Sequence, residues 1–145
     1  MSDSGWTGPG RAAGGAPARG APVLFTLALH GDPRGTMVSY GGNPGSAGAP
    51  GSQSPQRYPT SRRTFQRIRA TVLENSLTEP VTLTLIRNGE TATALTLRIP
   101  AGSPPGFKDT VRLVTPVMFD DGEDFDVQIA VNACEGVAKA SVSIE

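Results

Sequence analysis

The segment that most restricts the fold runs from residue 81 to residue 99 and reads VTLTLIRNGETATALTLRI. On both sides of Asn88 and Gly89, apolar side chains alternate with threonine, alanine or arginine. A period of two places the apolar set on one face of a β-strand. Asn-Gly marks a tight hairpin turn because both residues tolerate positive φ. The segment therefore predicts a β-hairpin with these inward side chains: Val81, Leu83, Leu85, Leu95, Leu97 and Ile99.

Similar alternation continues through most of the chain after residue 20. Further strands are predicted at residues 21–30, 64–74, 107–119 (one or two short strands, interrupted at Pro116), 125–131 and 136–145, and residues 36–40 form a short apolar piece. Turn-forming stretches separate several of them, at 31–35, 100–106 and 120–124. Seven or eight strands at spacings of roughly 8–12 residues, with no segment that reads as a helix, indicate an all-β fold. We expect a jelly-roll-like β-sandwich.

The strand predicted at 64–74 requires a choice of face. Two sets of side chains alternate along it: Phe65, Arg67 and Arg69 on one side, and Gln66, Ile68, Ala70 and Val72 on the other. We predict that the second set faces the core, because this choice leaves the arginines in water.

Glycine and proline divide the chain into an arm and a domain. Most of the 18 glycines and 13 prolines precede residue 60. Residues 1–20 lack periodicity and contain almost no large apolar side chains, so we expect a disordered or extended N-terminal arm. Trp6 is the large anchor in this arm, and we expect it to dock on the domain or on a neighbouring subunit. The domain then spans 21–145, with a long Gly/Pro-rich loop at 41–59.

Part of that loop, residues 42–53, reads GNPGSAGAPGSQ and has glycine at every third position. Glycine at this spacing is required at the axis of a collagen triple helix. Four triplets are too few to hold a triple helix, and they stand between two predicted strands. We therefore expect an extended, polyproline-like surface loop that is either an interaction segment or disordered.

Charge is balanced over the whole chain but not along it. The formal net charge is zero, with +6 up to Val72 and −6 from Leu73 onward. Such asymmetry steers the basic segment of one copy toward the acidic segment of another. We predict self-association, with these candidate interface residues: Trp6, Arg62, Arg63, Arg67, Arg69, Asp120, Asp121, Glu123 and Asp124.

The basic stretch at 57–69 and the acidic stretch at 120–126 are also candidate sites for nucleic acid and for a metal ion, respectively. Residues 57–69 combine arginines with Tyr58 and Phe65, a pattern that also suits nucleic-acid backbones. The zero net charge favours a protein partner instead, so we expect no nucleic acid. Residues 120–126 hold five carboxylates, enough oxygen for calcium, but without the spacing of an EF-hand loop. We predict a solvated acidic turn there and no metal site.

Catalytic signatures do not occur in the sequence. Cys134 is the only cysteine and His30 the only histidine, and no third group is evident that would orient them as a catalytic pair. There is no phosphate-binding loop, nucleophile elbow or set of metal-spaced histidines. We predict that the protein is not an enzyme and needs no cofactor, and that Cys134 is a small buried apolar residue.

Targeting and membrane signals are also not seen. Residues 1–10 read MSDSGWTGPG, which has no basic start and no apolar run, so we expect no secretory signal. No stretch approaches the roughly 20 apolar residues that a membrane span needs. We therefore expect no membrane partner.

Three stretches together resemble small jelly-roll domains of tailed bacteriophages: MVSYGGNPG (37–45), VTLTLIRNGETATALTLRIPAGSPPGFKDT (81–110) and VMFDDGEDFDVQI (117–129). Such domains occur as head-decoration proteins and as tail-fibre or spike tips, and they are usually trimeric. The pattern is also similar to the trimeric jelly rolls at the ends of bacterial and complement-type collagen-like proteins. The resemblance implies an architecture and a structural role, and it transfers no catalytic residue.

On this resemblance we expect a virion structural protein, either a capsid decoration (cement) protein or a tail-appendage subunit. Its expected partners are further copies of itself, in a trimer, and a major capsid or tail protein. Its expected location is the capsid surface or the tail, after synthesis in the host cytoplasm. The alternative is a receptor- or carbohydrate-binding module at a phage fibre tip, for which Trp6, Tyr40 and Tyr58 are the aromatic candidates.

Overall fold

The computed structural model describes residues 22–41, 58–60, 62–88 and 91–145. The strands are β1 (Val23–His30), β2 (Met37–Tyr40), β3 (Tyr58–Pro59), β4 (Arg63–Asn75), β5 (Val81–Arg87), β6 (Thr91–Ile99), β7 (Lys108–Phe119), β8 (Asp124–Val131) and β9 (Val137–Ile144). These described residues contain no helix, and so none that is long and apolar enough to cross a membrane.

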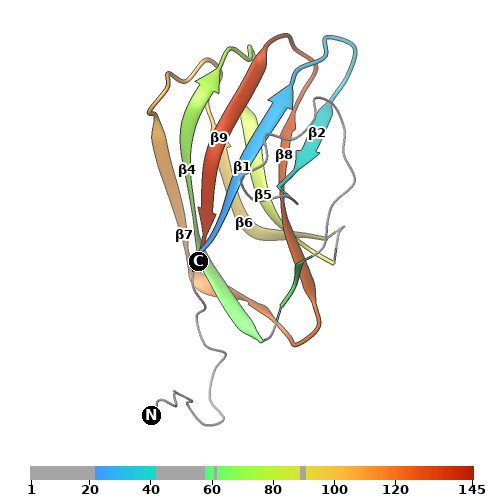
Figure 1. The fold of residues 1–145 in the computed structure, drawn as a ribbon, viewed down its shortest axis with the longest axis vertical. Helices are drawn as coiled ribbons and strands as arrows, with labels where there is room; N and C mark the ends of the chain where they lie inside the picture. The colour runs from blue at the N-terminus through green and yellow to red at the C-terminus, as the bar shows by residue number, and fades with distance from the viewer. Residues whose placement is uncertain (1–21, 42–57, 61, 89–90) are drawn as a thin grey trace.

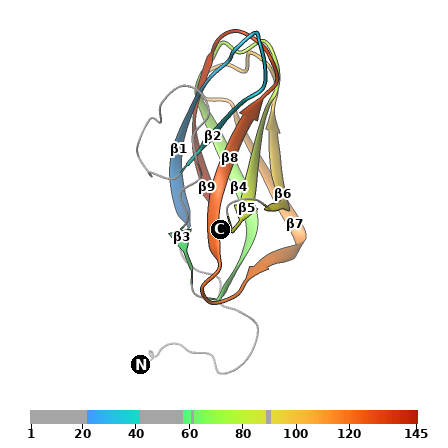
Figure 2. The same ribbon diagram turned by 90° about the vertical axis from the view of Figure 1, so that its right-hand side faces the viewer.

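The strands form two antiparallel sheets that lie face to face (Figure 1). One sheet has the order β1-β9-β4-β7, and the other has the order β2-β8-β5-β6, with the short β3 paired to β8. Figure 2 places β1 and β2 toward one side of the molecule and β6 and β7 toward the other. The all-β sandwich predicted from the sequence is confirmed.

The strand pairing is that of a jelly roll. With β3 set aside, the first strand pairs with the last (β1 with β9), and the second pairs with the last but one (β2 with β8). The same nesting continues inward through β4 with β7 and ends at the β5–β6 hairpin. The chain is therefore one long hairpin rolled into two layers, which is how a jelly roll arranges eight strands.

The predicted hairpin of residues 81–99 is present and supplies much of the core. Leu83 lies opposite Leu97 on β6 and Ile129 on β8, and all three side chains are fully buried. Asn88 has φ of 51°, the positive value expected for this turn. Burial of a leucine or isoleucine side chain of this kind contributes about 1.5–3 kcal/mol.

Cys134 is also buried, as predicted.

The prediction that Phe65 faces outward is wrong. Phe65 is fully buried, and its ring lies 5.4 Å from that of Phe119 and 5.1 Å from that of Phe125. The cause is a β-bulge in which the backbone N–H groups of Gln66 and Arg67 both donate to the carbonyl oxygen of Glu145. One extra residue reverses the side-chain alternation, so Phe65 and Ile68 both point inward.

Strand β7 is continuous but irregular around Pro116, where the sequence predicted an interruption. Arg112 pairs with Arg67 and Val117 pairs with Phe65, so residues 113–116 lie opposite the single residue Gln66. The Gln66 side-chain amide donates to the carbonyl oxygen of Leu113, at 2.9 Å. The excess chain bulges away from the sheet, and Val114 within it is 97% exposed.

The predicted arm and loop lie largely outside the described residues. Residues 1–20, with Trp6, and residues 42–57 are not among those that the structure describes. Tyr58 and Pro59 form β3, opposite Phe125 and Asp124 of β8. The predicted 41–59 loop therefore ends two residues earlier than expected, because its last residues extend a sheet.

The turn after β1 contains an acidic group with a depressed pKa. Asp32 accepts hydrogen bonds from the backbone N–H of Arg34 at 2.8 Å and from the Arg34 guanidinium at 3.0 and 2.8 Å. These bonds favour the carboxylate, so they lower the pKa of Asp32 from 3.8 to about 2.

We expect NMR titration to give a pKa of about 2 for Asp32 in the native protein. Arg34→Ala should raise that pKa toward its ordinary value, since the side-chain bonds are lost. Because the folded pKa is the lower one, the pair stabilises the fold above the unfolded pKa, and this stabilisation is lost as the pH falls toward 2. Arg62→Ala, a matched control, should leave the pKa of Asp32 unchanged; an unshifted titration in the native protein would contradict the expectation.

Candidate interaction surfaces

The acidic turn between β7 and β8 is held by its own hydrogen bonds. The backbone N–H of Asp120 donates to Glu123 Oε1 at 2.8 Å, and the N–H of Glu123 donates to the Asp120 carbonyl oxygen at 3.1 Å. Gly122 has φ of 84°, a conformation that glycine adopts without strain. The sequence DDGED therefore forms the turn that was predicted.

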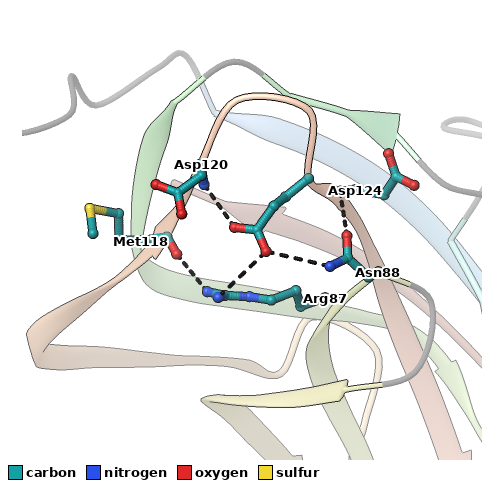
Figure 3. A network of polar contacts seen from close by, with 6 residues as sticks. Arg87, Asn88, Met118, Asp120 and Asp124 are labelled. Atoms are coloured by element: carbon teal, nitrogen blue, oxygen red, sulfur yellow. Dashed lines mark hydrogen bonds and ion pairs between the residues drawn. The ribbon is translucent and has the colours of Figure 1, made fainter.

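The end of β5 binds this turn within the same chain (Figure 3). Glu123 Oε2 lies 3.7 Å from the Arg87 guanidinium and accepts a hydrogen bond from the Asn88 side-chain amide at 3.4 Å. Asn88 Oδ1 accepts from the backbone N–H of Asp124 at 2.9 Å. Arg87 also donates to the carbonyl oxygen of Met118 and covers the Phe119 ring, 4.6 Å from its centroid. Sequence reasoning did not select Arg87 or Asn88, because both are far from the acidic turn in sequence.

The basic segment approaches the same turn from the other side. The backbone N–H of Arg62 donates to Asp121 Oδ1 at 2.6 Å, and Arg63 lies opposite Phe119 in the sheet. The Arg63 guanidinium covers the Phe65 ring at 4.1 Å from the centroid, and partial burial lowers the pKa of this group. Two of the predicted interface arginines, Arg62 and Arg63, therefore lie beside the acidic turn of the same chain.

The remaining predicted arginines lie farther along β4. Arg67 forms an ion pair with Glu145, and Arg69 is exposed between Thr110 of β7 and Ser143 of β9. Trp6 lies outside the described residues. A role for these predicted residues in contacts between copies stays a prediction. Among the described side chains, no three His, Cys, Asp or Glu residues are placed to hold a metal ion.

Exposed large apolar side chains of the described residues all lie on one sheet. They are Leu24 (63% exposed), Leu73 (45%), Val114 (97%) and Met118 (44%), and they belong to β1, β4 and β7 of the β1-β9-β4-β7 sheet. We name this surface, with these four residues as its apolar members, the assembly face. Single exposed apolar residues are ordinary, but their restriction to one sheet distinguishes its outer surface from that of the other sheet.

The local fold explains why these side chains point outward. Leu24 alternates with buried Phe25, and Met118 precedes buried Phe119. Leu73 occupies a register shift in the pairing of β4 with β9, between Val72 and Glu74. None of the four was predicted from the sequence. The alternation around Phe25 could have indicated that Leu24 points outward, and Pro116 could have indicated a protruding segment near Val114.

The outer surface of the other sheet carries a polar depression of about 220 Å³. Its centre is a row of side chains that are paired across three strands, Ala130 on β8, Thr82 on β5 and Arg98 on β6. We name this depression the polar hollow; its remaining lining residues are Thr36, Pro80, Val131 and Asn132. No residue of the hollow was selected from the sequence.

Comparison with known proteins gives little further information. No family model and no curated protein matches the chain. Among solved structures the chain is similar to the Eiger TNF of S. frugiperda, at 11% identity and a TM-score of 0.33, over 83% of this chain and 91% of that one. At this level the likeness carries nothing about function from one protein to the other.

Proposed function

We propose that the chain is a virion structural protein, a capsid decoration or tail-appendage subunit that acts through contacts between copies of itself. The observation that carries the proposal is that, among the described residues, the exposed large apolar side chains all lie on the assembly face. Covering Leu24, Leu73, Val114 and Met118 against a second copy removes apolar surface from water, at roughly 25 cal/mol per Å². The phage setting comes from the resemblance of residues 37–45, 81–110 and 117–129.

Two further features support another copy of this chain as the occupant of the assembly face. The formal net charge of zero means that copies do not repel one another over long range. Arg69 stands exposed on the same sheet as the four apolar residues, and arginine is enriched in protein interfaces. A trimer is the state we propose.

We expect light scattering coupled to gel filtration to give the mass of a trimer for the native protein. Val114→Asp places a charge on the apolar bulge and should weaken association at least about tenfold, or about 1.4 kcal/mol, with an unchanged circular dichroism spectrum. Thr96→Asp, at an exposed position of β6 on the other sheet, is the matched control and should leave the mass unchanged.

The virion setting is tested separately, by sedimenting the protein with assembled capsid shells or isolated tails. The native protein should sediment with one of the two. A monomer at high concentration that associates with neither shells nor tails would remove the proposal. A trimer without affinity for either particle would support the proposed self-association and contradict the proposed role in a virion.

A second candidate function, a receptor- or carbohydrate-binding module, is favoured by the polar hollow. The hollow lies on the sheet opposite the assembly face, so a trimer formed through that face would leave it open to a ligand. Tyr40 does not line the hollow; its hydroxyl accepts a hydrogen bond from Gln128 on the neighbouring strand, at 3.2 Å. A sugar in the polar hollow would therefore be recognised by hydrogen bonds and not by stacking on Tyr40.

A further inference from the structure

The polar hollow arises from side-chain size at one end of the β2-β8-β5-β6 sheet. Its floor is Ala130 and Thr82, which are short side chains directly opposite one another on β8 and β5. Arg98, opposite Thr82 on β6, borders the floor on one side. Pro80, Thr36 and Asn132 belong to the segments that lead into and out of the strands, and they also border it.

Arg98 is the charged group among the lining residues of the hollow. Within the described part of the chain, its guanidinium makes no hydrogen bond, ion pair or ring contact. By contrast, three other described arginines, Arg34, Arg67 and Arg87, each form an ion pair with an acidic side chain. A free guanidinium presents a fork of donors that fits a carboxylate or phosphate through two parallel hydrogen bonds.

The other polar groups of the hollow suit a ligand that carries hydroxyls. Thr36 and Thr82 each offer a hydroxyl that donates and accepts, and Asn132 offers an amide that does both. No aromatic side chain is among the lining residues, so a sugar would be held by hydrogen bonds and charge and not by stacking. The volume of about 220 Å³ is below the roughly 300–1,000 Å³ of pockets for drug-sized ligands, which suits a single sugar ring.

We propose that the polar hollow binds an acidic monosaccharide, with Arg98 pairing with its oxyanion and Thr36, Thr82 and Asn132 bonding to its hydroxyls. This inference rests on the second candidate function and is independent of the assembly face. The oxyanion is the carboxylate of a uronate or the phosphate of a sugar phosphate, because the guanidinium fork fits both.

The test is titration of the isotopically labelled full chain, followed by NMR, with D-glucuronate and D-glucose 6-phosphate in separate arms. We expect one of them to shift the backbone amides of Thr82, Arg98 and Ala130, and the stronger arm identifies the oxyanion. D-Glucose should bind at least about tenfold more weakly, since it lacks the charge. Acetate and inorganic phosphate should also bind at least about tenfold more weakly, since they lack the hydroxyls.

Variants distinguish the hollow from binding elsewhere on the protein. Arg98→Gln keeps a long polar side chain and should weaken binding of the acidic sugar at least about tenfold. Thr82→Val keeps the shape and removes one hydroxyl, and it should weaken binding by a smaller factor. Arg112→Gln, an exposed arginine on the opposite sheet, is the matched control and should bind like the native protein.

The proposal is overturned if neither acidic sugar shifts these amides at about 10 mM, a concentration that would nearly saturate a site with a Kd of about 1 mM. It is also overturned if acetate or phosphate binds as tightly as the sugars, or if Arg98→Gln binds like the native protein. Light scattering of Arg98→Gln should give the native mass, so a failure here is distinguishable from a failure of the proposed assembly.

Discussion

Phe119→Ala is expected to lower the free energy of unfolding by about 3–5 kcal/mol, measured by urea denaturation under conditions of reversible two-state unfolding. The Phe119 side chain is fully buried and packs edge-on against Phe65, with ring centroids 5.4 Å apart. The ring centroid of Phe125 lies 6.2 Å from that of Phe119, so the three rings form one cluster. Truncation leaves a cavity among rings that belong to both sheets, and it also removes the ring that Arg87 covers.

Thr110→Ala, an exposed position on the same strand, is the control for this measurement and should change the free energy of unfolding by less than about 0.5 kcal/mol. A loss below about 1 kcal/mol for Phe119→Ala would mean that the three rings do not form a packed cluster.

Gly136→Ala is expected to have an effect of similar size, for a different physical reason. A Cβ at this position would lie 2.4 Å from the carbonyl oxygen of Ser76 and 2.9 Å from the backbone nitrogen of Leu77. Both are backbone atoms, so relief requires the β4–β5 connection to move away. The φ of +109° adds strain for any L side chain. We expect the free energy of unfolding to fall by more than about 3 kcal/mol, or the chain to fail to fold.

Gly106→Ala separates the two causes. Gly106 also has a positive φ, +88°, but a Cβ there meets nothing within 4 Å. We expect the backbone strain alone to cost about 1–2 kcal/mol in urea denaturation. Gly35→Ala has neither the positive φ nor the close approach and should be nearly neutral. Equal losses for Gly136→Ala and Gly106→Ala would show that the contact with Ser76 is unimportant.

Local signals were sufficient for the longer strands, but not for the short β3 or for the irregularities within strands. The alternation around Asn88 predicted the β5–β6 hairpin, because the pattern and the turn residues are adjacent in sequence. The outward prediction for Phe65 was wrong because the bulge at Gln66 and Arg67 depends on Glu145, which is about 80 residues away in sequence. Alternation with a period of two does not reveal a β-bulge, because the bulge is held by the carbonyl oxygen of a residue far away in the sequence.

The candidate surfaces were predictable only in part, for a similar reason. Charge patterning located the acidic turn and the basic segment, but it could not show that Glu123 pairs with Arg87 or that Asp121 accepts from Arg62. The polar hollow was not predictable, because it requires Ala130, Thr82 and Arg98 to be neighbours on three strands. That adjacency is a property of the strand order, which the hydrophobic pattern of single segments leaves undetermined.

The pairing of β1 with β9 has a consequence for synthesis on the ribosome. Val23 lies opposite Ile144, so β1 cannot pair with β9 until about 120 further residues have been synthesised. At about 5–20 residues per second, the nascent chain waits several seconds or longer with Phe25, Leu27 and Leu29 uncovered. The β1–β9 ladder therefore closes only after residue 144 has been synthesised, and a chaperone that shields β1 until then would raise the yield of native protein.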